Sequence, residues 1–257
     1  MRGLLFKKIK QNWIALLMSF LFPAIICFLS LLLSGTEETE DFSLTRACEV
    51  FGINGTLTRI LYCGFVYFTL GSLQANVLVA DENKKWGYFV ASTPKGKEGQ
   101  MYSNYLIIFM MCGLTYISYI IIETALGVLT YHLTGEICTS IVGITSFMLY
   151  VQLFLRAIEL PSLVRFGTKI GGHLRAIVLA LLVVGVGVYL LFGPLPTDSG
   201  TLAESIFSFI EDFTNGLIPD WLLFMQSIFP VIAVGGFILS WFISSNFYLK
   251  GVENYDK

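Results

Sequence analysis

Few residues of this 257-residue chain are of types that perform chemistry, and they lie far apart in the sequence. Glu123 is the one ionisable residue well inside an apolar stretch, where a charge is costly and often functional. It could form a substrate or proton site, or only an interhelical hydrogen bond, and we expect no lysine or arginine deep inside a membrane span to neutralise it. His132 and Glu136 have the HxxxE spacing of metal-binding pairs in intramembrane proteases, but no third ligand accompanies them. We therefore expect no metal site.

The cysteines show no spacing typical of a metal site or a redox motif. Four of them lie in or near expected membrane spans, where cysteine usually packs as a small hydrophobic residue. Cys48 is expected outside the membrane and could pair with Cys63 or Cys138, although the odd number of cysteines favours free thiols. Gly96-Lys97 lacks the other residues of a phosphate-binding loop, so we expect no nucleotide, cofactor or catalytic site in this chain.

The composition is that of a membrane protein. Hydrophobic residues make up 55% of the chain, charged residues only 13%, and the mean hydropathy is +0.74. A soluble domain carries about a quarter charged residues, and a helix needs about 20 apolar residues to cross a bilayer. Six stretches meet or approach that length, at about 13–34, 58–80, 101–130, 137–158, 176–193 and 221–245. We therefore expect an all-α membrane protein, one transmembrane domain over residues 1–257 with six spans.

The basic residues predict which way the chain crosses the membrane. With these spans, 14 of the 16 lysines and arginines fall on one side, and only Arg46 and Arg59 fall on the other. Positively charged loops stay in the cytosol, so we expect both termini to be cytosolic. The net charge of −2 provides no field to attract nucleic acid, which excludes that class of partner.

Residues 1–12 predict an amphipathic helix in the cytosolic interface. Apolar residues recur there on one face, and the lysines, Lys7, Lys8 and Lys10, lie largely off it. The alternative is a charged flank of the first span with no structure of its own.

A second amphipathic helix is expected on the extracellular side, between spans five and six. Thr201 and Glu204 form a capping-box pattern, and Asn215-Gly216 supplies a stop. This helix could dip into the membrane as a lid or only pack on the outer surface. Its apolar residues are Leu202, Ile206, Phe209, Ile210 and Phe213.

The most informative polar segment lies between spans two and three, on the expected cytosolic side. Asp81 can cap a short helix, in which Trp86, Phe89 and Val90 fall on one face. Aromatic residues rimmed by charge are typical of a protein interface, although lysine and tryptophan also suit a helix that rests on lipid headgroups. The candidate contact residues are Asp81, Glu82, Asn83, Lys84, Lys85, Trp86, Tyr88, Phe89 and Val90.

The residues 82–94, Glu-Asn-Lys-Lys-Trp-Gly-Tyr-Phe-Val-Ala-Ser-Thr-Pro, are followed by Lys-Gly-Lys-Glu-Gly-Gln before the third span. This pattern resembles the permease of bacterial ABC-2 type transporters, and within them small peptide exporters of the phenol-soluble modulin type. The resemblance covers the whole chain: a basic interfacial N-terminal helix, six spans, a coupling helix between spans two and three, and an outer helix between spans five and six.

The resemblance implies a non-catalytic permease in the plasma membrane of a bacterium, which exports amphipathic or antimicrobial peptides or other hydrophobic molecules. It implies a second permease copy or paralogue and a separate ABC ATPase subunit that holds ATP and Mg²⁺. Residues 81–91 would be the coupling helix in a groove of that ATPase, and ATP would switch a cavity between inward-facing and outward-facing states. A second cytosolic loop would make lesser contacts through Arg156, Arg165, Lys169 and Arg175.

Two other classes of function compete with this interpretation. An ion-coupled secondary transporter would use Glu123 as its proton site and is expected to show an internal repeat, which is not visible in the sequence. A membrane-embedded protease would need the His132 and Glu136 pair to be catalytic.

Overall fold

The computed structural model describes residues 2–35, 43–53, 55–79, 84–93, 96–138, 140–192 and 220–253. All regular elements within these ranges are helices. Over most of 168–192 and over 220–226 it gives the backbone alone. In chain order the elements are α1 (Arg2–Gln11), α2 (Trp13–Gly35), α3 (Leu44–Ala47), the π-helix η1 (Cys48–Ile53), α4 (Thr56–Val79), α5 (Lys84–Ser92), α6 (Gly96–Thr134), α7 (Val142–Phe192) and α9 (Asp220–Val252).

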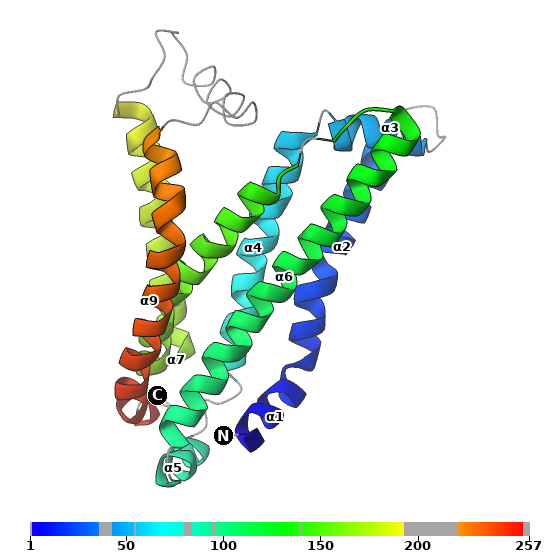
Figure 1. Cartoon of the computed structure of the whole chain (residues 1–257). Helices are drawn as coiled ribbons and strands as arrows, with labels where there is room; N and C mark the ends of the chain where they lie inside the picture. Colours follow the sequence, from blue (N-terminus) through cyan, green and yellow to red (C-terminus); the bar gives the residue numbers. More distant parts are fainter. Residues whose placement is uncertain are drawn as a thin grey trace.

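The long helices run up and down between two ends of the molecule (Figure 1). Short α1 and α5 lie at one end, called here the α5 end, together with both ends of the chain. Short α3 lies at the other, the α3 end. The helices α2, α4 and α6 stand beside one another, and residues 142–166 of α7 lie against α4 and α6. The later part of α7 and α9 stand side by side and diverge from the others towards the α3 end (Figure 1).

Helix α7 consists of two arms that meet at a kink. Gly167 has a φ of 80° inside it, a conformation that favours glycine, so the chain reverses there at the α5 end. The first arm, 142–166, covers the expected span 137–158 except at its start, and the backbone of the second arm covers nearly all of the expected span 176–193. The expectation of a loop over 156–175 is wrong, because the backbone there is helical on both sides of the kink, whereas the cytosolic side of this segment stays a prediction.

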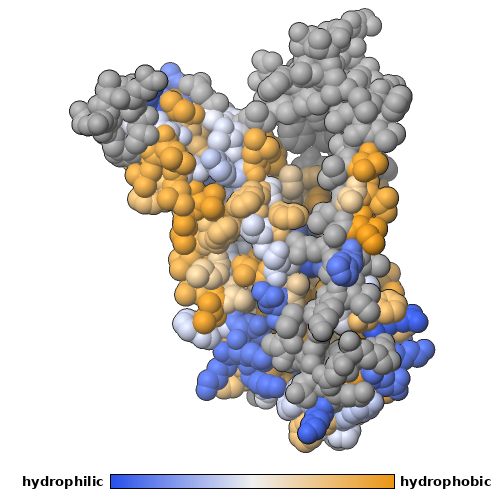
Figure 2. Space-filling model, turned by 180° about the vertical axis from the view of Figure 1, so that it is seen from behind, coloured by the Kyte–Doolittle hydropathy of each residue, from blue (hydrophilic) through white to orange (hydrophobic). Residues whose placement is uncertain are grey.

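Five helical segments in the described part are long and apolar enough to cross a membrane: Trp13–Gly35, Thr58–Leu78, Gly96–Thr134, Val142–Gly167 and Ser227–Val252. The sixth crossing, expected at 176–193, stays a prediction. The expected extracellular helix, with Leu202, Ile206, Phe209, Ile210 and Phe213, lies outside the described residues. Figure 2 shows hydrophobic residues over the body of the molecule and hydrophilic residues gathered mainly at the α5 end, the pattern that a bilayer around the body requires.

The N-terminal helix is present, but one of its lysines lies where the sequence did not place it. Lys8 is buried, and its Nζ donates a hydrogen bond to the backbone carbonyl of Val77 at 2.9 Å. Val77 is in the last turn of α4, where carbonyls have no partner within the helix. An ammonium group satisfies such a carbonyl and the helix dipole together, so Lys8 faces inward while Lys7 and Lys10 stay exposed.

The contacts of α9 with α6 gather near the α5 end. The hydroxyl of Tyr105 on α6 lies 2.7 Å from the hydroxyls of both Ser240 and Ser244 on α9. The Tyr105 ring packs on Phe237, with 5.0 Å between ring centroids. A buried hydroxyl without partners is costly in an apolar surrounding, so these bonds fix the register between the two helices.

A Tyr105→Phe variant keeps the ring and loses both hydroxyl contacts. A side-chain hydrogen bond between membrane helices is worth about 0.6 kcal/mol on average, so we expect a loss of about 1 kcal/mol and a melting temperature about 2–4 °C lower. Thermal unfolding of the purified protein in detergent measures it. The matched control is Tyr102→Phe one turn away, where the side chain is half exposed; an equal shift in both variants would contradict the assignment.

Candidate functional site

Helix α5 turns one face into the protein and another outward. Gly87 and Val90 are buried, and Val90 is only 1% exposed, because α5 lies against both α6 and α9. On the outward face Phe89 is 60% and Tyr88 47% exposed, with Lys85 beside them. The expectation that Val90 shares an outward face with Phe89 is therefore wrong. Helical spacing alone could not predict that Val90 is buried and Phe89 exposed, because this depends on which side of α5 is covered by α6 and α9.

Trp86 stands at the border between these two faces. Its ring lies 5.5 Å from the Phe89 ring, and the Nζ of Lys7 on α1 sits 3.3 Å above its centroid. Such a cation–π contact is worth about 0.5–1 kcal/mol at an exposed site. The N-terminal helix thus holds α5 from one side, a role of Lys7 that a basic residue at the start of a chain does not reveal.

The end of α5 is closed by short local hydrogen bonds. The Thr93 hydroxyl donates to the Val90 carbonyl at 2.7 Å, and the Ser92 hydroxyl donates to the Phe89 carbonyl at 2.7 Å. The observed helix begins at Lys84, so Asp81, Glu82 and Asn83 of the expected coupling segment lie outside the described residues, and the expected cap by Asp81 stays a prediction.

The basic residues of the expected second loop have different surroundings. Arg156 is buried in α7 and forms an ion pair with Glu159, one turn further along, so its place at a cytosolic surface is a wrong expectation. The acidic partner three residues away removes the need for water around the guanidinium, and the helix continues. Arg165 is exposed and lies over the rings of Phe166 and Phe247. The side chains of Lys169 and Arg175 lie outside the described residues.

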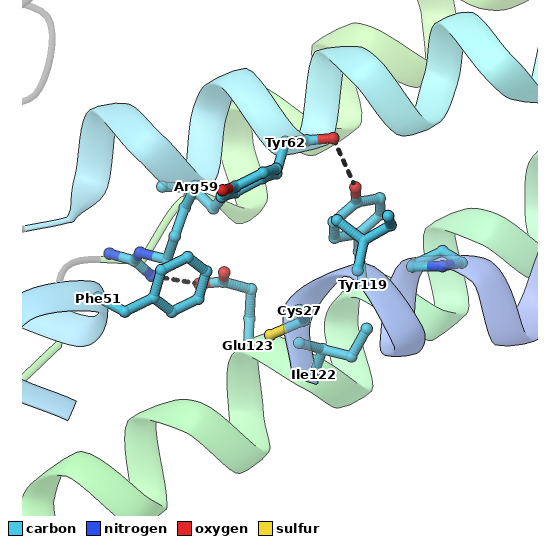
Figure 3. Close-up of a pocket in the computed structure, with 10 residues that line it drawn as sticks. Cys27, Phe51, Arg59, Tyr62, Tyr119, Ile122 and Glu123 are labelled. Carbon is cyan, nitrogen blue, oxygen red and sulfur yellow. Dashed lines mark hydrogen bonds and ion pairs between the residues drawn. The ribbon is translucent and has the colours of Figure 1, made fainter. Parts of the chain in front are cut away.

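Glu123 has a partner that the sequence reading missed. Nη1 of Arg59 on α4 donates to Oε2 of Glu123 on α6 at 2.9 Å, and both side chains are less than a tenth exposed. Figure 3 shows the guanidinium reaching across to the carboxylate. The statement that no basic residue neutralises Glu123 is therefore wrong. Helix α6 has 39 residues and α4 has 24, so α6 extends beyond α4. Glu123, far along α6, therefore lies level with Arg59 at the start of α4.

A small cavity of about 20 Å³ adjoins this ion pair, close to the space that one water needs. Cys27, Phe51, Tyr62 and Tyr119 are among its lining residues, and the Tyr119 hydroxyl donates to the Tyr62 carbonyl at 3.4 Å (Figure 3). The cavity is too small for an organic substrate. Its position beside a buried charge pair makes it part of the packing between α2, α4 and α6.

A chain of amide groups continues the polar interior towards the α5 end. Nε2 of Gln152 on α7 donates to Oε1 of Gln74 on α4 at 3.0 Å, and Nε2 of Gln74 contacts the Cys112 sulfur on α6 at 3.0 Å. These three buried side chains join three helices. Polar groups in lipid surroundings are satisfied within the protein, so this chain specifies how α4, α6 and α7 fit together.

The remaining residues of chemical type form no metal-binding group in the part that the structure describes. His132 and Glu136 lie exposed at the α3 end, and no set of three or more histidine, cysteine or acidic residues is placed to hold a metal there. All five cysteines are free thiols. Cys48 is buried, and the Cys138 thiol donates to the Gly52 carbonyl at 3.0 Å. Burial raises the pKa of both thiols above their ordinary value, which keeps them protonated.

Comparison with known proteins identifies the family of this chain. A family model described as ABC-2 family transporter protein matches residues 47–249. The chain belongs to this family. Searches of curated proteins and of solved structures found no match. As an ABC-2 family protein the chain is a membrane component of a transporter, which supports the permease expected from the polar segment. The matched range includes α5, both members of the Arg59–Glu123 pair and all of α7, whereas α1 and α2 precede it.

The Arg59–Glu123 pair of this ABC-2 protein can be tested with charge-free substitutions. Arg59→Met alone leaves a buried carboxylate unpaired, which costs about 3–5 kcal/mol. Adding Glu123→Gln removes the orphaned charge, so we expect the double variant to recover most of the loss. Unfolding in mixed micelles measures the free energies, and Glu136→Gln, at an exposed site, is the control. A double variant as unstable as the sum of the two single ones would exclude a direct pair.

Proposed function

We propose that this ABC-2 family protein is the permease subunit of an ATP-driven exporter, and that a separate ABC ATPase subunit binds the outward face of α5. The observation that carries the proposal is the exposure of Phe89 and Tyr88 beside Lys85 on a helix whose other face is fixed to α6 and α9. Aromatic residues on a rigid element anchor protein interfaces, and rigid attachment lets a force applied to α5 reach the long helices.

The energy source of this exporter is proposed to lie on the partner. Among the described residues of the chain no group of histidine, cysteine and acidic side chains is placed to hold a metal ion, and the sequence has no phosphate-binding loop. ATP and Mg²⁺ are therefore assigned to the ATPase subunit. ATP binding would close a pair of ATPase subunits, draw two copies of α5 together and shift two permease copies between inward-facing and outward-facing states.

The proposed cargo is an amphipathic peptide or another hydrophobic molecule. An open hollow of about 590 Å³ lies on one face of α6, in its half towards the α3 end, and none of its described lining residues is acidic, lysine or arginine. Its lining consists of Ile120, Ile121, Thr124, Ala125, Val128, Leu129 and His132. A wall of this kind suits apolar groups with occasional hydrogen bonds and offers nothing to an ionic substrate.

The α5 end is proposed to face the cytosol of a bacterium, with the body of the protein in the plasma membrane. The support is the excess of basic residues at that end, which keeps loops on the cytosolic side. An ion-coupled carrier based on Glu123 is not favoured, because Arg59 occupies the side of the carboxylate where an ion would bind.

A Phe89→Asp variant tests the docking of the ATPase subunit. A carboxylate in place of an aromatic anchor must be desolvated on binding, so we expect the affinity for the ATPase subunit to fall by a factor of about 30 or more, which is about 2 kcal/mol. Copurification with the ATPase subunit and transport of a dye-labelled amphipathic helical peptide into inverted vesicles are the measurements.

Two further variants make this test specific. Phe89→Leu keeps an apolar side chain and is expected to retain most of the affinity, whereas Tyr131→Asp places the same charge on an exposed aromatic position at the α3 end and is expected to leave docking unchanged. If the Phe89→Asp permease retains the ATPase subunit and transports at the normal rate, α5 is not the docking site.

A further inference from the structure

Helices α6 and α9, and α7 next to its kink, meet beside the buried face of α5. Met101 of α6, Val164 of α7, and Tyr248 and Val252 of α9 form a buried cluster, and Ala91 of α5 packs against it. This group, called here the end cluster, is separate from the main core, which lies further along the helices. It is the place in the described structure where the last turn of α9 contacts the element that we propose to receive the ATPase.

The contact between α5 and α9 is as close as side chains permit. A Cβ built on Gly87 would lie 2.7 and 2.8 Å from the two Cγ atoms of Val252, and Val252 is fully buried. Real carbon atoms do not approach so closely, and valine has little rotamer freedom in a helix. The Val252 side chain therefore packs directly against the backbone of α5 at Gly87, and α5 cannot move towards α9 without displacing α9.

The last turn of α9 is equally close to α7. A Cβ built on Gly251 would lie 1.8 Å from the Val164 backbone carbonyl oxygen. Val164 comes three residues before Gly167, where α7 kinks. The end of α9 is thus held between α5 on one side and the kink of α7 on the other, with glycine at each of the two contacts.

Helix α9 is attached to α6 unevenly along its length. Near the α5 end, Tyr105 joins α6 to α9 through Ser240 and Ser244, and Tyr102 packs edge-on against Trp241 at 6.4 Å. Towards the α3 end, α9 and the second arm of α7 diverge from α2, α4 and α6 (Figure 1), whereas the first arm stays in contact with α4 and α6 through Thr145 and Ser146. Helix α9 also packs on the first arm of α7 further along, where the Phe229 ring lies 5.4 Å from the Phe147 ring, so a displacement of the end cluster can pass along α9 to that arm.

We infer that the Gly87–Val252 contact is where motion of α5 enters the α7 and α9 pair, so that Gly87 is a positioning residue for transport. The inference rests on the proposed function, since it takes α5 as the element that the ATPase subunit moves. The ATPase moves α5, the end of α9 follows, and Gly251 passes the displacement to α7 beside its kink. Gly87 itself touches neither the ATPase face nor the cargo.

A Gly87→Ala variant and its compensating partner test this inference. The extra methyl group overlaps Val252, so the two helices must separate, and we expect transport of a dye-labelled amphipathic helical peptide to fall on the order of tenfold. Copurification of the ATPase subunit and the rate of ATP hydrolysis are expected to persist, because the outward face of α5 is unchanged. The second substitution, Val252→Ala, makes room for the methyl group and is expected to restore transport in the double variant.

Matched measurements separate this role from mere damage to folding and from failure of the proposed function. Gly235→Ala, on α9 where an added Cβ meets nothing within 4 Å, is expected to transport normally. Normal transport by Gly87→Ala, or a loss that Val252→Ala does not restore, would overturn the inference while the ATPase still copurifies. If the wild-type permease holds no ATPase subunit, the proposed function fails instead. The melting temperature of the permease alone, lowered by Gly87→Ala and restored in the double variant, then still reports the packing contact.

Discussion

A bilayer offers no water to a buried charge, and the interior of this protein is organised around that constraint. Arg59 meets Glu123, Arg156 meets Glu159, and Lys8 meets a helix-terminal carbonyl, so each of these charges has a partner inside the protein. Breaking such a pair is far more costly than never having made it. The Arg59–Glu123 and Lys8–Val77 contacts therefore hold α1, α4 and α6 in one arrangement, and the exposed apolar surface of these helices is left for lipid.

The positions of most crossings could be predicted because they depend on composition alone: an apolar run of about 20 residues has few other places to go. What could not be predicted depends on neighbours. Val90 and Phe89 differ in burial because α6 and α9 cover one side of α5 and not the other. The burial of Lys8 depends on a carbonyl of α4, far away in sequence. The segment expected as a loop at 156–175 is helical on both sides of Gly167, and Arg156 lies buried in it beside Glu159, a pairing that a count of charges does not reveal.

The existence of α5 was predicted from a polar break and a cluster of aromatics, but its mechanical setting was not. A helix that only reversed the chain would need one fixed side at most. Helix α5 contacts Lys7 of α1, α6 and the end of α9, and its Phe89 and Tyr88 side chains are still exposed. Attachment on three sides is what the proposed transmission of force through α5 requires.

The bond between Lys8 and Val77 also bears on how the protein is made. Its two ends are 69 residues apart, so the N-terminal helix cannot dock until the whole of α4 has been synthesised and has returned to the same side of the membrane. Until then Lys8 stays charged and solvated at the surface, where its attraction to anionic headgroups helps to hold the first span in its orientation. The same ammonium group thus first helps to orient the first span and afterwards joins α1 to the end of α4.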